Sequence, residues 1–147
     1  MSFELDISTF RPDRPGIRKV LGDLEAEIME LIWARPSGEG TAVRDIFEIL
    51  HDRRPIAYTT VMSTMARLAR KKLLRIEKKD QAYIYYPTST EKEFVSLFIG
   101  RILEDLFVSF SGSVLDGIET IRDPQAASQA RQLFDEISRR REEEEAE

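Results

Sequence analysis

The hydrophobic pattern of this chain changes its period at Leu74, and that change limits the folds open to it. Apolar residues first recur at helical spacing in three stretches, within residues 21–34, from about Thr41 to before Pro55, and over residues 57–72. Residues 74–78 then alternate apolar with charged side chains, and residues 82–86 are rich in strand formers. Three short helices followed by a hairpin predict a winged helix-turn-helix with a two-stranded wing.

The chain becomes helical again after Pro87, with apolar residues on more than one face. Thr88 and Glu91 have the spacing of a capping box, and Asp123 followed by Pro124 is a start signal for the last helix. One small domain cannot cover this much apolar surface, so we infer a partner subunit. The residues expected at the interface of this homodimer are apolar and lie on the helix at residues 91–107 or on the last helix: Phe94, Phe98, Ile102, Leu106, Phe107, Leu133, Phe134 and Ile137.

These patterns divide the 147 residues into four segments of a mostly helical, α+β chain. We expect a flexible N-terminal extension at residues 1–20, a winged-helix domain at 21–87, a helical dimerisation region at 88–141 and a fraying acidic tail at 142–147. No stretch approaches the roughly 20 apolar residues that cross a bilayer, and the N-terminus lacks the apolar run of a signal peptide. We therefore expect a soluble, cytoplasmic protein with no membrane partner.

The charge is unevenly distributed, although the whole chain carries a net charge of −5. Residues 57–79 contain seven basic residues and one acidic residue, a net charge of +6, whereas residues 87–147 contain seven basic and fourteen acidic residues, a net charge of −7. A phosphate responds to the local field, which is screened over roughly 10 Å at moderate salt. The basic middle is therefore compatible with DNA binding, and a solvated charged helix face is the alternative.

The helix expected from about Tyr58 to Lys72 has the two faces that a DNA-reading helix needs. Val61, Met65 and Leu68 form an inward stripe, and the outer residues expected to contact base edges are Thr59, Thr60, Ser63 and Arg67. Threonine and serine are mediocre helix formers, so helix stability alone does not explain three of them on an exposed face. The alternative is an ordinary polar face of an amphipathic helix.

Contacts with DNA phosphates are expected at the ends of this helix and at the wing. The expected residues are Tyr58, Arg70, Lys71, Lys78 and Lys79. A solubilising hairpin tip is the alternative for the last two. We interpret Tyr83, Tyr85 and Tyr86 mainly as packing and cross-strand residues, because proteins that read duplex DNA rarely stack on its bases.

The sequence offers no credible catalytic or cofactor site. The absence of cysteine excludes disulfides, thiol catalysis and cysteine-ligated metals, and a single histidine, His51, argues against a metal cluster built on imidazoles. The pattern places no histidine base near a serine and contains no glycine-rich phosphate loop. We therefore expect no enzyme activity, no metal, no cofactor and no small-molecule ligand.

Three stretches together resemble the penicillinase repressor family, the BlaI–MecI–CopY group. They are residues 24–33 (LEAEIMELIW), residues 57–61 (AYTTV) with Arg67 and Leu68 downstream, and residues 82–87 (AYIYYP). The resemblance covers residues 21–107 and, more weakly, the helices beyond. It implies an N-terminal winged helix, a C-terminal dimerisation region, and repression through double-stranded DNA at a palindromic operator with TACA-type half-sites.

The resemblance also implies modes of regulation, and this chain departs from the family pattern in three places. In the β-lactam branch a membrane sensor triggers proteolysis of the C-terminal region, which weakens the dimer. The copper branch uses C-terminal cysteines, which this chain lacks. Asp80-Gln81 stands where the family usually has Gly-Arg at the wing tip, and the extension before Leu21 is longer than expected. A winged-helix adaptor for protein partners is the alternative function, and it would lack salt-dependent binding to duplex DNA.

Overall fold

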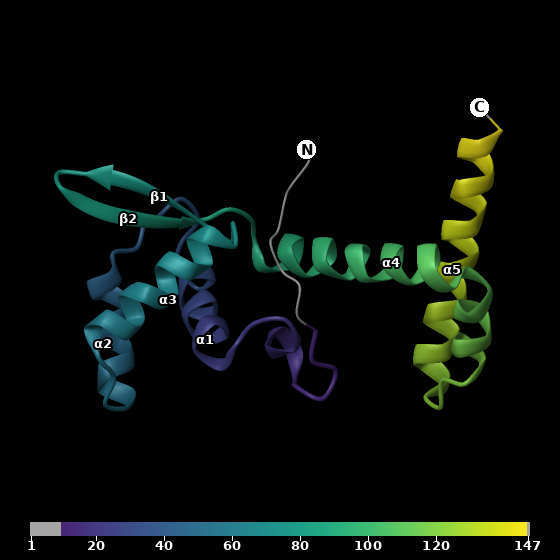
Figure 1. The fold of residues 1–147 in the computed structure, drawn as a ribbon, viewed down its shortest axis with the longest axis horizontal. Helices are drawn as coiled ribbons and strands as arrows, with labels where there is room; N and C mark the ends of the chain where they lie inside the picture. Colours follow the sequence, from purple (N-terminus) through teal and green to yellow (C-terminus); the bar gives the residue numbers. More distant parts are fainter. Residues whose placement is uncertain (1–9, 147) are drawn as a thin grey trace. The chain divides into compact units, whose positions relative to one another are not determined.

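The computed structural model describes residues 10–146 and divides into two compact units, Met1–Phe98 and Ile99–Glu147. Along the chain run a 3₁₀ helix η1 (Gly16–Lys19), α1 (Asp23–Trp33), α2 (Val43–Arg53), α3 (Tyr58–Arg70), β1 (Leu74–Lys79), β2 (Ala82–Pro87), α4 (Glu91–Glu119) and α5 (Pro124–Glu145) (Figure 1). This order confirms the expected mostly helical winged helix with a two-stranded wing. Within residues 10–146, no helix combines the length and apolar character needed to cross a membrane.

The core of the first unit lies between α1, α2, α3 and the inner face of the wing. Ile28 on α1, Ile46 on α2 and Leu74 on β1 are buried in it. Val61, Met65 and Leu68 on α3 are all 0 % exposed, which confirms the inward stripe expected from their spacing. Burying one complete face of α3 fixes which of its residues point outwards.

The wing is an antiparallel hairpin whose tip is a turn of two residues. Asp80 and Gln81 both have positive φ, 48° and 68°, as a type I′ turn requires. At the base of the hairpin, Thr41 forms a bridge with Tyr85, with N–O distances of 2.9 Å and 2.8 Å. Gly40 permits this approach, because a Cβ there would lie 2.2 Å from Cγ2 of Ile84. The loop before α2 therefore packs against the hairpin and holds its base.

Thr88 joins the end of the hairpin to the end of α3 instead of capping α4. Its backbone N–H donates to the carbonyl of Leu73 at 3.0 Å, and its Oγ1 donates to the carbonyl of Lys72 at 2.8 Å. The capping box of α4 is formed by Thr90 and Glu93, whose backbone N–H donates to Thr90 Oγ1 at 3.1 Å. The expected box at Thr88 was wrong by two residues, because the carbonyls after α3 use the Thr88 hydroxyl.

Phe94, in the first turns of α4, belongs to the core of the first unit. It is 1 % exposed, and its ring centroid lies 5.6 Å from that of Trp33. Trp33 is held in turn, because its Nε1 donates to the carbonyl of Ser89 at 3.0 Å. The expected place of Phe94 in a subunit interface is therefore corrected, since almost none of its surface remains for a second chain.

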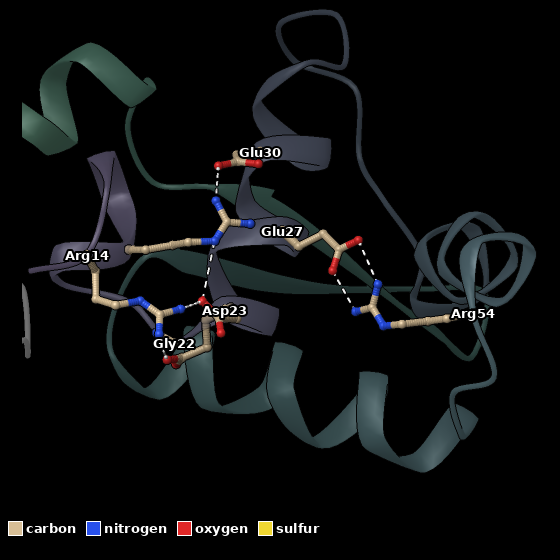
Figure 2. Close-up of polar contacts among 8 residues, drawn as sticks. Arg14, Gly22, Asp23, Glu27, Glu30 and Arg54 are labelled. Carbon is tan, nitrogen blue, oxygen red and sulfur yellow. Dashed lines mark hydrogen bonds and ion pairs between the residues drawn. The ribbon is translucent and has the colours of Figure 1, made fainter.

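Part of the segment expected as a flexible extension is folded onto α1. The 3₁₀ helix η1 places Ile17 against the core, and Val20 is buried. Arg14 pairs with Asp23, and Arg18 Nη1 donates to Glu30 Oε1 at 3.3 Å (Figure 2). Residues 1–9 of the extension lie outside the described residues.

The second unit contains the later part of α4 together with α5. Phe110 has φ −137° and ψ 39°, so α4 breaks there into two helical pieces. The Phe107 ring stacks on Phe134 at 5.6 Å between centroids, and Arg131 pairs with Glu119. These contacts link α4 to α5.

The start of α5 agrees with the sequence prediction, but its end lies beyond the predicted end. Asp123 caps its start, with Oδ1 accepting from the Gln125 N–H at 3.0 Å, and Pro124 occupies the first helical position, as predicted. At the other end the helix continues to Glu145, where the sequence suggested fraying after residue 141. Four consecutive glutamates therefore form the last helical turn.

Glu27 ties α1 to the end of α2. Its Oε2 accepts from Arg54 Nη2 at 2.6 Å and its Oε1 from Arg54 Nη1 at 3.0 Å (Figure 2). Its Oε1 also accepts from Arg53 Nη1 at 3.0 Å. Its side chain is only 15 % exposed. The Arg54 hydrogen bonds stabilise the carboxylate and hold the pKa of Glu27 below its ordinary value, against the opposing effect of burial.

We expect Glu27→Gln to lower the free energy of unfolding by about 1–2 kcal/mol at pH 7, because the charged partner of both arginines is lost. Because the pKa of Glu27 is lower in the folded than in the unfolded state, its ionised carboxylate stabilises the fold at pH values above the unfolded-state pKa. This stabilisation is lost as the pH falls through the folded-state pKa. The difference between wild type and variant should therefore persist from pH 7 to pH 5 and shrink below the ordinary pKa of 4.5. Urea unfolding at pH 7, 5 and 3 measures this, and a difference independent of pH would contradict it.

Candidate nucleic-acid interface

The outer face of α3 presents a continuous polar stripe. Pro55 keeps the chain extended before the helix, and Ala57, with φ −81° and ψ 142°, is its N-cap. Thr59, Ser63 and Arg67 follow at intervals of four residues, so they share one side of the helix. These residues and Thr60 are all exposed, and the fold therefore brings the four residues expected to contact bases onto one surface.

The hydrogen bonds on this face show which side-chain groups remain open. Ser63 Oγ donates to the Thr60 carbonyl at 3.2 Å, which leaves its oxygen able to accept. Buried Thr64 donates to the same carbonyl at 2.7 Å and is committed to the helix. Within residues 10–146, neither Arg67 nor Arg70 makes an ion pair or a side-chain hydrogen bond, so both guanidinium groups are open to an external acceptor.

Two large side chains add apolar surface beside the stripe. Tyr58 and Met62, one turn apart on α3, are both exposed. The Tyr58 ring packs edge-on against Phe47 of α2, with 5.4 Å between centroids, and Phe47 stacks on His51 at 5.2 Å. Tyr58, expected near a phosphate, is thus held in place by α2, and Met62 offers an apolar contact for a thymine methyl group.

Lys71 has an intramolecular partner. Its Nζ lies 2.8 Å from Oε2 of Glu25, whose Oε1 accepts the Gly22 N–H at 3.0 Å. Glu25 is buried, so this pair joins the end of α3 to the start of α1. Of the two cations expected to hold phosphates at this end of α3, Arg70 is open and Lys71 is engaged.

The two wing lysines lie on opposite faces of the hairpin, because side chains alternate along a strand. Lys79 donates to the Tyr86 hydroxyl at 2.6 Å, and this hydrogen bond raises the pKa of Lys79. Arg75 covers the same ring from 4.3 Å. Lys78 lies opposite Tyr83 on the other face, and within residues 10–146 its amine makes no hydrogen bond or ion pair.

Tyr83 was not recognised as a surface residue from the sequence. Tyr85 and Tyr86 are buried, as expected of packing residues, but Tyr83 is 58 % exposed. It shares a face with Tyr85 and lies two residues nearer the tip, beyond the helices that cover the base of the hairpin. The position of Tyr83 close to the turn could have indicated its exposure from the sequence. Tyr83 and Lys78 lie together on the exposed part of this face of the wing.

The remaining residues expected at a dimer interface do not all lie on one surface. Phe98, like Phe94, packs against the core of the first unit. In the second unit an open apolar groove is lined by five of the eight expected residues: Leu106, Phe107, Leu133, Phe134 and Ile137. Leu133 is 55 % exposed, so much of this apolar surface is uncovered in the single chain. Ile102 is half-buried and does not line the groove.

Three helices that share one core and are followed by a two-stranded hairpin make the first unit a winged helix. The chain belongs to the penicillinase repressor family, whose sequence profile matches residues 21–139. This confirms the resemblance found in its three sequence stretches and extends it through most of α5. The extension before Leu21 lies outside the match.

Two relatives carry the name transcriptional regulator BlaI, from the Mycobacterium tuberculosis strains CDC 1551 / Oshkosh and ATCC 25618 / H37Rv. Each is 42 % identical to this chain over 76 residues, which is 52 % of this chain and 54 % of the relative. The chain thus matches about half the length of these curated relatives. Both names and the family description are those of regulators, in agreement with the expectation that this chain is not an enzyme.

We expect Lys71→Ala to reduce the free energy of unfolding by about 1–3 kcal/mol, because it leaves the buried Glu25 carboxylate without its cation. Arg70→Ala, one residue away, is the matched control and should stay within about 0.5 kcal/mol of wild type, since its side chain is exposed. Chemical denaturation of both variants measures the difference. Equal stability of the two variants would contradict a structural role for Lys71.

Proposed function

We propose that this chain is a transcriptional repressor that binds a palindromic DNA operator as a homodimer. The observation that carries the proposal is the exposed stripe of Thr59, Thr60, Ser63 and Arg67 on a helix whose opposite face is completely buried. In helix-turn-helix docking the N-terminal residues of the recognition helix meet base edges in the major groove. A rigidly anchored helix with open donors and acceptors on that side has the chemistry for this contact.

The stripe and its surroundings divide into two kinds of DNA contact. Arg67 can donate two hydrogen bonds to guanine, while threonine methyl groups and Met62 suit the methyl group of thymine. Arg70, Lys78 and the Tyr58 hydroxyl supply contacts with phosphates, which position the protein without reading sequence. Lys71 and Lys79 add positive potential from the places where Glu25 and Tyr86 hold them.

The second unit supplies the dimer in this proposal. The apolar groove between α4 and α5 leaves Leu106 and Leu133 exposed, and a second copy would cover them. A two-fold dimer demands a roughly palindromic site with half-sites about one helical turn apart. The β-lactam branch of the family implies that repression is relieved by cleavage in the C-terminal region. Such cleavage would remove the dimer interface, so a single winged helix would keep only half of the dimer's contacts with the operator.

Selection from a random pool of duplex DNA tests the proposal as a whole. We expect an inverted repeat with half-sites about 10 base pairs apart, because two identical recognition helices are related by a two-fold axis. Sedimentation of the protein alone should show a dimer at micromolar concentration. Binding without sequence preference, or no salt-dependent binding at all, would contradict the repressor and favour an adaptor for protein partners.

Arg67→Ala and Lys78→Ala should weaken DNA binding in different ways. Losing Arg67 should cost about 1–3 kcal/mol on the selected site and less on other sequences, so that specificity falls. Losing Lys78 should weaken all sequences alike and lower the slope of log K against log salt by about 1 per subunit. Fluorescence anisotropy titrations at several salt concentrations separate the two effects. The same loss on every sequence for both variants would refute the division of roles.

A further inference from the structure

The side chain of Tyr85 is buried, but its hydroxyl group has no partner inside the chain. Tyr85 is 5 % exposed and its ring belongs to the core of the first unit. Within residues 10–146 its hydroxyl makes no hydrogen bond. The fully enclosed side-chain atoms that lack a partner in this part of the chain are Arg35 Nε and Thr41 Oγ1, so the Tyr85 hydroxyl still reaches solvent. A buried tyrosine usually finds a hydrogen-bond partner, and this one can do so only outside the chain.

Tyr58 and Tyr83 bring two further phenol groups to the same place. Burial raises the pKa of Tyr85, and the nearby phenol groups of Tyr58 and Tyr83 raise it further. Tyr83 shares a face of β2 with Tyr85, and the Tyr58 ring packs on Phe47, which lies against the core that contains Tyr85. A phenol is protonated at neutral pH and can donate. We call these three hydroxyl groups the phenol cluster.

The phenol cluster lies between α3 and the wing, because Tyr58 is the first residue of α3 while Tyr83 and Tyr85 belong to β2. The helix and the hairpin are joined at one end, where the Thr88 N–H donates to the Leu73 carbonyl at 3.0 Å, and they diverge from there (Figure 1). In the proposed complex α3 enters the major groove and the wing lies beside it. The sugar-phosphate strand that borders the major groove therefore passes between the two elements.

The surroundings of the phenol cluster suit an anion. Lys78 lies directly opposite Tyr83 in the hairpin, and its amine is open within residues 10–146. No side chain caps the start of α3, and the N–H groups of Tyr58 and Thr59 have no acceptor in the described part of the chain. Open N–H groups at the positive end of a helix favour a phosphate.

We propose that the phenol cluster binds one phosphate of the DNA strand that passes between α3 and the wing. Tyr85 donates from the base of this site, and Tyr58 and Tyr83 donate from the helix and from the wing. The inference rests on the proposed DNA binding and adds Tyr83 and Tyr85 to it as residues that position the strand without reading its sequence. It also accounts for a tyrosine in the core, where a hydroxyl without a partner adds nothing to stability.

Tyr85→Phe tests the site, and Thr41→Val is its matched control. Each variant removes one hydroxyl that has no partner in the chain, but Thr41 Oγ1 is fully enclosed and cannot reach DNA. Both variants should keep the wild-type midpoint of urea unfolding, because neither loses a hydrogen bond within the fold. In fluorescence anisotropy titrations Tyr85→Phe should bind every duplex about fivefold more weakly, or worse, whereas Thr41→Val should bind as wild type does.

Two further measurements show whether the acceptor is a phosphate. A neutral hydroxyl displaces no counterion, so Tyr85→Phe should leave the slope of log K against log salt unchanged, unlike Lys78→Ala. Methylphosphonate can replace the phosphates of the selected duplex one at a time. At one position in each half-site this change should weaken binding of the wild type but hardly affect Tyr85→Phe. Such a loss of additivity identifies the phosphate that Tyr85 contacts.

The outcomes separate this site from the proposed repressor. Equal DNA affinity of Tyr85→Phe and wild type overturns the phosphate site and leaves the repressor intact. A loss confined to particular sequences, or a lower unfolding midpoint for Tyr85→Phe alone, overturns it too, because the hydroxyl would then read a base or stabilise the fold. A wild-type chain without salt-dependent binding to duplex DNA overturns both proposals. Weaker binding to every sequence at unchanged stability, with non-additivity at one phosphate, supports the site.

Discussion

The complete burial of one face of α3 is the constraint on which the candidate interface depends. Val61, Met65 and Leu68 leave no rotational freedom to the helix, because turning it by one residue would expose them and bury charge. The same packing orients the wing, since Leu74 and Tyr85 at its base enter the same core. The outward stripe and the exposed part of the hairpin are therefore consequences of one hydrophobic cluster.

The positive charges of the first unit divide into structural and open groups. Arg53 and Arg54 hold Glu27, and Lys71 holds Glu25, so these cations join helices that are distant in sequence. Arg67 and Lys78 have no such partner within residues 10–146. A count of basic residues over 57–79 treats all of them alike. The contacts of each side chain show which cations stabilise the fold and which are available to bind phosphate.

The regular elements could be predicted because hydrophobic period is a local property. The three helices and the hairpin were expected within about two residues of their observed bounds, and Asp123 with Pro124 marked the start of α5. The errors arose where distant residues compete for a group. Thr88 binds carbonyls at the end of α3, and Phe94 packs on Trp33, contacts that no local pattern contains. The exposure of Tyr83 likewise depends on where the covering helices end.

In the proposed dimer, the acidity of the second unit opposes the hydrophobic groove. Residues 99–147 contain six basic and twelve acidic residues, so two copies bring net charges of −6 together. That acidity also disfavours contact between these helices and DNA phosphates, which confines binding to the winged helix. Apolar burial at Leu106 and Leu133 must exceed the repulsion.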